Sequence, residues 1–292
     1  MEESELKNYL TAGEIWKEVA GGIQIRPDMK ILDLVDSTEK KIIDRGGKLA
    51  FPVNVSINEM AAHDTAGLEE NRVIGENDVV KVDIGVHING FIADGAFTID
   101  LSVENDKLLN AAKEALDNAI SSVKDGVNTA DIGRIIEDTI KKYGYKPIEN
   151  LGGHSLGKYL LHSGIEIPNY ASRSGAILKE GDVIAIEPFA TNGLGHVVET
   201  TRTEIFSIIA EMPTRNQNAR NLFKKISEGY ETLPFAERWV IKNLEDKIAL
   251  RELVRNESLR QYPVLKEKEN GLISQFEHTV IVEKDSCKVT TE

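Results

Sequence analysis

The two strand-like segments on either side of Asn89-Gly90 constrain the fold more than any other part of the chain. Apolar residues alternate with other residues in both segments, and Asn-Gly favours a type I′ turn, in which both central residues have positive φ. With this dipeptide as the loop, the register pairs Asp83 with Ala96 and Asp94 with Gly85. The two aspartates then point from the same face as diagonal neighbours, whose Cα atoms lie roughly 7–8 Å apart.

The face that contains the two aspartates has two interpretations. Amphipathic hairpins commonly expose acids to solvent, whereas two carboxylates on one buried face repel each other unless a cation lies between them. The opposite face is apolar and is predicted to face the core; its members are Val82, Ile84, Val86, Ile88, Phe91, Ala93, Gly95 and Phe97. The hairpin alone leaves this choice open, and a turn with an odd number of residues would put the aspartates on opposite faces.

Composition excludes several classes of protein. The 292 residues suffice for one large domain or two ordinary ones. A formal net charge of −13 argues against a nucleic-acid partner, because the phosphate backbone would be repelled. A single cysteine, Cys287, cannot form an intramolecular disulfide, and no apolar run reaches the length of a membrane span. The first residues also lack a secretion-signal pattern, so we expect a cytoplasmic protein with no membrane partner.

Periodicity predicts two pairs of helices, and a short repeat suggests that the chain is duplicated. The predicted helices cover residues 12–20, 30–45, 107–124 and 129–143, with Thr129 as the N-cap of the last. Segments 76–83 and 180–187 align at a constant offset of 104 residues, with an acid at both ends of each. If each half contributes two helices and antiparallel strands, a pseudo-twofold arrangement places Glu187 in the structural position of Asp83.

The C-terminal third interrupts this pattern and then resumes it. Residues 211–264 have apolar side chains at helical spacing and charges on the other faces, which predicts a helical insertion between residues 1–210 and 265–292 of the main domain. Residues 271–282 alternate again, and we expect one strand with Gln275, Glu277 and Thr279 on a single face.

Four strand-borne acids and one histidine form a candidate ligand set: Asp83, Asp94, His154, Glu187 and Glu277. By itself His154, which follows two glycines, is more often a loop histidine than a ligand. Together the five residues would form an oxygen-rich site for two metal ions, which bridging carboxylates hold roughly 3.5–4 Å apart. Such ligands suit Mn, Fe(II) or Co(II), with Zn also compatible, and the set lacks the thiolates of a structural zinc site.

The order and context of these residues resemble the methionine aminopeptidases and their pita-bread relatives. The shared pattern is an aspartate, a second aspartate 11 residues later, Gly-Gly-His, Ile-Glu-Pro-Phe and Phe-Glu-His-Thr. The resemblance runs from about Phe51 to the C-terminus and implies an α+β pita-bread fold, with pseudo-twofold duplicated helices around a curved antiparallel sheet and a helical insertion. The 90 residues between Glu187 and Glu277 resemble type 2 rather than type 1, and the absence of a charged N-terminal extension resembles the archaeal form.

The resemblance implies a role for each ligand. Asp83 chelates one metal ion, Asp94 and Glu277 bridge the two ions, and His154 with Glu187 completes the other. Glu187 is also the expected general base. The implied cofactor is a pair of divalent ions chosen from Co, Mn, Fe(II), Zn and Ni.

The resemblance also implies the substrate and the residues that contact it. His63 and His162 are expected to donate hydrogen bonds to the substrate and to the developing oxyanion, and Phe51 and Leu161 to line the methionine pocket. The expected reaction is hydrolytic removal of an N-terminal methionine from peptides and nascent proteins with a small second residue. The ribosome is a candidate partner, and we expect a monomer.

Two alternatives stay open. Prolidases and aminopeptidase P share the five ligands, but they usually have a large N-terminal domain, for which the 82 residues before Asp83 leave no room beside the predicted helices. A non-catalytic pita-bread binding protein would be expected to have lost ligands, and all five are present here.

Overall fold

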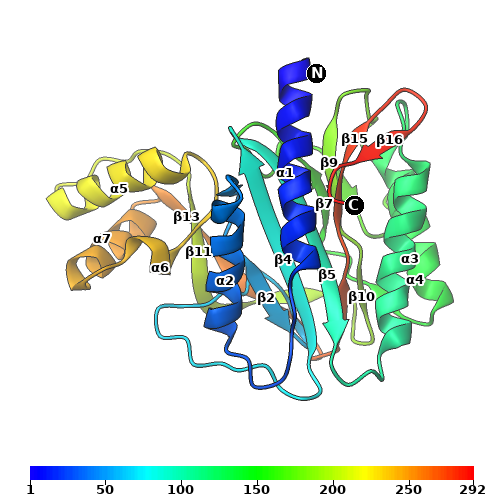
Figure 1. Cartoon of the computed structure of the whole chain (residues 1–292), viewed down its shortest axis with the longest axis horizontal. Coiled ribbons are helices and arrows are strands. Elements are labelled where there is room, and N and C mark those ends of the chain that lie inside the picture. Colours follow the sequence, from blue (N-terminus) through cyan, green and yellow to red (C-terminus); the bar gives the residue numbers. More distant parts are fainter.

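A long antiparallel hairpin runs through the middle of the molecule in the computed structural model, which describes residues 1–292 (Figure 1). Its strands are β4 (Val79–Ile88) and β5 (Phe91–Asp100). Asn89 and Gly90 have φ of 54° and 90°, and the register pairs Asp83 with Ala96 and Gly85 with Asp94. The two-residue turn is confirmed, and the two aspartates therefore share a face.

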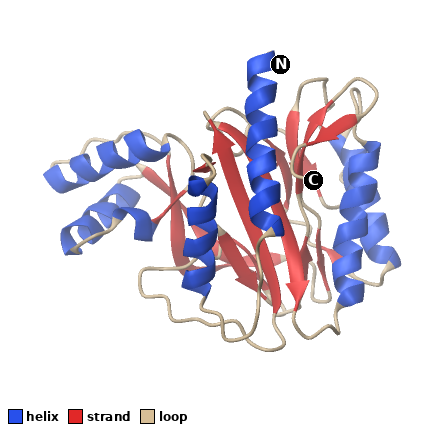
Figure 2. Ribbon diagram, viewed as in Figure 1, coloured by secondary structure: helices blue, strands red, loops and turns tan.

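Two helices cover the apolar face of this hairpin, α1 (Glu3–Gly21) and α2 (Ile31–Asp44) (Figure 2). The indole N–H of Trp16 donates to the carbonyl oxygens of Ile84, at 2.9 Å, and Gly95, at 3.2 Å. A Cβ atom on Gly95 would lie 2.7 Å from that indole, so the close approach requires glycine. Helix α1 begins earlier than residue 12, because the Glu5 carboxylate accepts the N–H of Glu2 at 3.0 Å and completes its first turn.

Short strands complete the first half of the molecule, which we define as α1, α2 and β1 to β5. β1 (Lys48–Leu49) and β2 (Asn54–Ile57) pair with β4, and β3 (Met60–Ala62) follows β2. The pairing sets Asn54 opposite Asp83.

The second half consists of α3 (Asp106–Ser122), α4 (Thr129–Lys142) and two small sheets. One sheet has the order β16-β15-β9-β7-β8, from Cys287–Val289, His278–Val282, Val183–Ile186, Gly152–Ser155 and Glu166–Pro168. The other has the order β14-β10-β6, from Ile273–Gln275, Phe189–Thr191 and Lys146–Pro147. The two helices pack against these strands through a separate apolar cluster.

The proposed duplication has a structural counterpart before β4 and β9. Asp78 accepts the backbone N–H of Gly75 at 2.7 Å, and Asp182 accepts that of Lys179 at 2.8 Å. Both contacts close the turn that leads into a buried strand; β4 contains Asp83, and β9 ends one residue before Glu187. The same local structure therefore occurs at the offset of 104 residues seen in the sequence.

Two local predictions were wrong. Asn128, rather than Thr129, is the N-cap of α4, because its side chain accepts the N–H of Ala130 at 2.9 Å while the Thr129 hydroxyl accepts the N–H of Ala176. Residues 271–282 are not one strand but two, because β14 pairs with β10 whereas β15 pairs with β9. At this break Glu277 forms a single bridge with Ala96 of β5 and so faces the first half.

A helical unit projects from one side of the molecule (Figure 1). It comprises α5 (Gln217–Tyr230), α6 (Glu237–Val240) and α7 (Leu244–Arg255), which follow β11 (Val197–Ile208) and precede β13 (Leu259–Glu267). With β12 (Phe235–Ala236) and β3, the two long strands form a sheet of order β12-β11-β13-β3. The helices have their own apolar cluster with this sheet, and no helix of the protein is both long and apolar enough to cross a membrane.

A buried ion pair joins the helical unit to α2. Arg238 of α6 lies 2.5 Å from the Glu39 carboxylate, and the indole N–H of Trp239 donates to the same oxygen at 3.0 Å. The other oxygen of Glu39 accepts the backbone N–H of Val53 at 3.3 Å. Because a buried charge is costly once its partner is removed, this contact fixes α6 against the segment that contains Phe51.

Candidate metal centre

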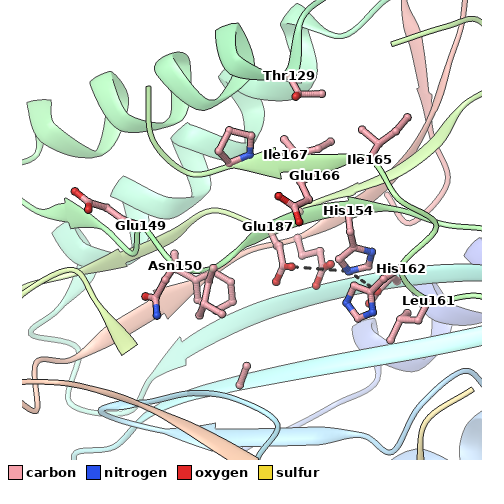
Figure 3. Close-up of a pocket in the computed structure, with 18 of the residues that line it drawn as sticks. Thr129, Glu149, Asn150, His154, Leu161, His162, Ile165, Glu166, Ile167 and Glu187 are labelled. Carbon is pink, nitrogen blue, oxygen red and sulfur yellow. Dashed lines mark ion pairs between the residues drawn. The ribbon is translucent and has the colours of Figure 1, made fainter. Parts of the chain in front are cut away.

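A cavity of about 1320 Å³ lies between the two halves and the strands β11 and β13. All nine residues that the sequence indicates for the site line it: Phe51, His63, Asp83, Asp94, His154, Leu161, His162, Glu187 and Glu277. His154, Leu161, His162 and Glu187 gather at one place in the close-up (Figure 3). The structure therefore brings these residues together, although they come from segments far apart in the chain.

The candidate ligands converge from both halves. β4 and β5 provide Asp83 and Asp94, β7 provides His154, and Glu187 and Glu277 follow β9 and β14. His154 Nε2 lies 3.8 Å from Asp94 Oδ2 and 3.8 Å from Glu187 Oε1 (Figure 3). Ligand atoms of Asp94, His154 and Glu277 lie within 4.8 Å of one another. Two ligands that are each about 2 Å from one ion have separations of this order.

Unpaired polar atoms in this cluster fit a cation. Asp83 Oδ1, Asp94 Oδ1 and His154 Nδ1 are buried and have no hydrogen-bond partner. Buried polar atoms nearly always have a partner, so a group of such atoms needs an explanation. Carboxylate oxygens and a neutral imidazole are suitable ligands for a divalent ion, and the set contains no thiolate.

Electrostatics also favour a cation. Burial raises the pKa of Asp83, and burial together with repulsion from neighbouring carboxylates raises the pKa values of Asp94, Glu187 and Glu277. Burial lowers the pKa of His154 to about 3, so its imidazole is neutral and free to act as a ligand. Positive charge among the carboxylates would let them ionise together at neutral pH.

Several supporting residues were not identified from the sequence. The Gln275 amide donates to Glu187 Oε2 at 3.3 Å, and the Thr279 hydroxyl accepts the backbone N–H of Asp94 at 2.8 Å. Both residues belong to the alternating face that contains Glu277, and this pattern was the only sequence signal that could have indicated them as part of the site. Asn54 lines the cavity with a buried, unpaired Oδ1, and only strand pairing places it opposite Asp83.

The two histidines differ in their hydrogen-bonding capacity. His63 Nδ1 lies 3.1 Å from the carbonyl oxygen of Pro263, and burial lowers the pKa of His63 to about 4. A carbonyl only accepts, so Nδ1 of the neutral ring has the proton and Nε2 is an acceptor. The His162 ring lies 4.3 Å from that of His154, and desolvation in the cavity, with a smaller effect of Arg260, lowers the pKa of His162.

An apolar wall adjoins the cluster. Phe51 is buried against β4, where a Cβ atom on Gly85 would lie 2.3 Å from its ring. Leu161 packs against the group of apolar side chains that contains Phe51. Cys287 lies outside the cavity, and burial raises the pKa of its thiol to about 11, so the thiol stays protonated at neutral pH.

Substitution of a central ligand tests the cation site directly. Asp94→Ala should lower the affinity of metal-free protein for Mn²⁺ at least tenfold, because it removes a carboxylate that lies within 4.8 Å of ligand atoms of both His154 and Glu277. Calorimetric titration measures the affinity, and Asp131→Asn, an exposed change on α4, is the control. Equal affinities for Asp94→Ala and the unsubstituted protein would contradict the site.

The pH dependence of stability gives a second test. A carboxyl whose pKa is higher in the folded than in the unfolded state binds its proton more tightly when folded, so its stabilising effect is lost as pH rises from the unfolded pKa through the folded one. The metal-free protein should therefore lose thermal stability between about pH 4 and pH 7, the latter being the raised pKa of Asp83. The increase in melting temperature with Mn²⁺ should grow over this window, and an increase independent of pH would refute the explanation.

Comparison with known proteins agrees with the metal site that the geometry indicates. The model of metallopeptidase family M24 matches residues 7–284. The methionine aminopeptidase of Methanothermobacter thermautotrophicus is 46% identical over 296 residues, which cover 98% of this chain and 99% of that protein. The methionine aminopeptidase of Archaeoglobus fulgidus is 47% identical over 294 residues, which cover 100% of both chains.

Solved structures agree on the fold. A thermophilic Arx1 superimposes with a TM-score of 0.87 at 19% identity, over 99% of this chain and 91% of its own. The methionine aminopeptidase of Rickettsia prowazekii superimposes with a TM-score of 0.73 at 20% identity, and the match covers 100% of this chain and 98% of that protein. The pita-bread fold expected from the sequence is thereby confirmed. Because the family model matches residues 7–284 and relatives share 46% and 47% sequence identity with it, the chain belongs to metallopeptidase family M24.

Proposed function

We propose that this protein hydrolyses the first peptide bond of peptides that begin with methionine, in a metal-dependent reaction. The observation that supports this most strongly is the convergence of five ligand-type side chains, three of them with unpaired buried atoms, beside an apolar wall in one cavity. The names of the relatives, methionine aminopeptidase in each case, support the choice of substrate.

The five ligands have distinct proposed roles. Asp83 would hold one divalent ion, Asp94 and Glu277 would help to hold both ions, and His154 with Glu187 would hold the other. Bound divalent ions would supply Lewis acidity and lower the pKa of water. Co, Mn, Fe(II), Zn and Ni all suit this ligand set. Glu187, whose pKa burial raises, is the proposed general base that takes the proton of the attacking water.

The histidines are proposed to hold the scissile peptide from two sides. His63 Nε2 is an acceptor, so this residue would receive a hydrogen bond from the substrate N–H rather than donate one, contrary to the expectation from the sequence. His162, which is neutral at physiological pH, would donate to the carbonyl oxygen as negative charge develops there.

The remaining proposals concern substrate size and cellular context. Phe51 and Leu161 would surround the methionine side chain, and the second residue would be small. Nascent proteins are proposed substrates, with the ribosome as a candidate partner, and the protein would act as a monomer in the cytoplasm. We also propose that residues 211–264 form an insertion subdomain within a catalytic domain of residues 1–210 and 265–292.

A proline-directed peptidase is the main alternative. The prolidase of Pyrococcus furiosus superimposes with a TM-score of 0.66 at 17% identity, and the match covers 100% of this chain but only 64% of the prolidase. The part of the prolidase outside the match agrees with the larger architecture expected of that branch. A binding protein without activity is disfavoured because all five ligand-type residues line the cavity.

A pair of peptides separates these functions. With Mn²⁺ or Co²⁺ added, the protein should release methionine from Met-Ala-Ser and should not cleave an Xaa-Pro peptide, as liquid chromatography of the products would show. Cleavage of only the proline peptide would favour the prolidase function, and cleavage of neither would favour the binding protein.

Exchange of one histidine should mainly affect catalysis. His162→Ala should lower kcat on Met-Ala-Ser by roughly 10² to 10³, the usual effect of removing one oxyanion donor. His196→Ala, an exposed change outside the cavity, is the control and should stay within about twofold of the unsubstituted enzyme. If His162→Ala raises KM while kcat is unchanged, the proposed role of His162 in the transition state is wrong.

A further inference from the structure

Lys81 is a lysine in an unusual environment. It is 1% exposed and is among the largest of the fully buried side chains. Its Nζ donates to the backbone carbonyl oxygens of Asn58, at 3.0 Å, and Ile273, at 3.1 Å. Lysine is almost never fully buried unless it is paired, and here both acceptors are carbonyl groups rather than carboxylates. A role that only this side chain can perform would explain its presence.

The two carbonyls belong to segments that lead to the site. Asn58 lies in the turn between β2 and β3 with φ of 54°, and the chain continues from this turn to His63. Ile273 begins β14, which ends at Gln275, and the chain then continues to Glu277. The carbonyl of Asn58 also accepts the N–H of Ile273 at 3.2 Å. Lys81 therefore closes a junction of β4, the β2–β3 turn and β14.

This junction lies at one end of the contact between the two halves. We define the seam as the contacts of residues 94–98 with residues 275–279. The Thr98 hydroxyl donates to the carbonyl of Gln275 at 2.7 Å, and Ala96 bridges Glu277. Lys81 is the strand partner of Thr98, so its contact with Ile273 extends the seam by one further link.

The seam determines how the metal ligands meet. Asp83 and Asp94 belong to the first half, whereas Glu277 follows β14, which pairs with β10 of the second half. A shift of β14 along or away from β4 would change the distance between the two sets of carboxylates. It would also move Gln275, whose amide holds Glu187.

We propose that Lys81 is a positioning residue that clamps β14 and the β2–β3 turn to β4, and thereby sets the spacing of the metal-binding carboxylates of the two halves. This inference rests on the proposed function, because that reaction needs ligands from both halves. Lys81 does not line the cavity, and it acts through Glu277, Gln275 and the segment that leads to His63.

The clamp does not depend on the charge of the side chain. Burial lowers the pKa of Lys81 to about 7, and the negative charge of Asp64 is the largest effect in the opposite direction. An ammonium group and an amine both have N–H bonds for the two carbonyls. Small amines from solution can therefore replace the lost group in a variant that leaves space for them.

The experiment uses two variants of the full chain. Lys81→Met keeps the length of the side chain but has no donor, whereas Lys81→Ala leaves a space near the two carbonyls. Both should bind Mn²⁺ about tenfold or more weakly by calorimetry, and kcat/KM on Met-Ala-Ser should fall by a similar factor. Methylammonium chloride should raise kcat/KM of Lys81→Ala at least about threefold relative to tetramethylammonium chloride at equal ionic strength. It should not raise kcat/KM of Lys81→Met.

A second lysine near the same turn is the control. Lys266 pairs with Glu59 at 3.5 Å on a partly exposed side of the turn, so Lys266→Met should leave Mn²⁺ affinity and kcat/KM within about twofold. Circular dichroism checks that each variant is folded. If Lys81→Ala does not fold, Lys81→Met alone decides the question, because it keeps the buried volume.

The outcomes separate this inference from the proposed function. Unchanged Mn²⁺ affinity and kcat/KM in Lys81→Met would overturn the clamp, even if the unsubstituted enzyme cleaves Met-Ala-Ser. Weakened function in folded Lys81→Ala without any rescue by methylammonium would also overturn it, because general destabilisation would then suffice as the cause. If the unsubstituted protein cleaves neither test peptide, the proposed function fails while the Mn²⁺ titrations still test the clamp.

Discussion

The structure is organised around repulsion among carboxylates that converge from two halves of the chain. Burial raises the pKa values of Asp83, Asp94, Glu187 and Glu277, and nearby negative charge adds to this for the last three. Such a cluster is unfavourable without protons or cations. The unpaired atoms of Asp83, Asp94 and His154 show that the protein does not neutralise the cluster with its own hydrogen bonds.

The fold holds this unfavourable arrangement in place through contacts outside the cluster. Hydroxyls of Thr98 and Thr279 bond backbone groups across the seam, and Gln275 holds the Glu187 side chain. Lys81 adds a link at the end of the seam. The ligands are thus positioned by strand pairing and buried polar contacts, which are rigid enough to oppose the repulsion and to keep the spacing that two shared ions would need.

Local pattern predicted some elements well and others poorly, for identifiable reasons. The β4–β5 hairpin was predicted in full because Asn-Gly turn chemistry and alternation both act over short distances. The break at Glu277 was missed because alternation continues through it, while the pairing partners change from β10 to β9. The hydrogen-bonding role of His63 stays a proposal for a similar reason, since His63 Nδ1 lies beside the carbonyl of Pro263, which is 200 residues away in the sequence.

Residue type, spacing and local backbone preference were enough to predict the turn at Asn89-Gly90, the shared face of Asp83 and Asp94, the repeat and the candidate ligands. Whether that face meets solvent or a cavity follows from the three-dimensional fold alone, because Glu187 and Glu277 reach the cavity from the other half. The fold also revealed Asn54 and Lys81, whose partners adjoin them only through long-range strand pairing and seam contacts that sequence spacing does not encode.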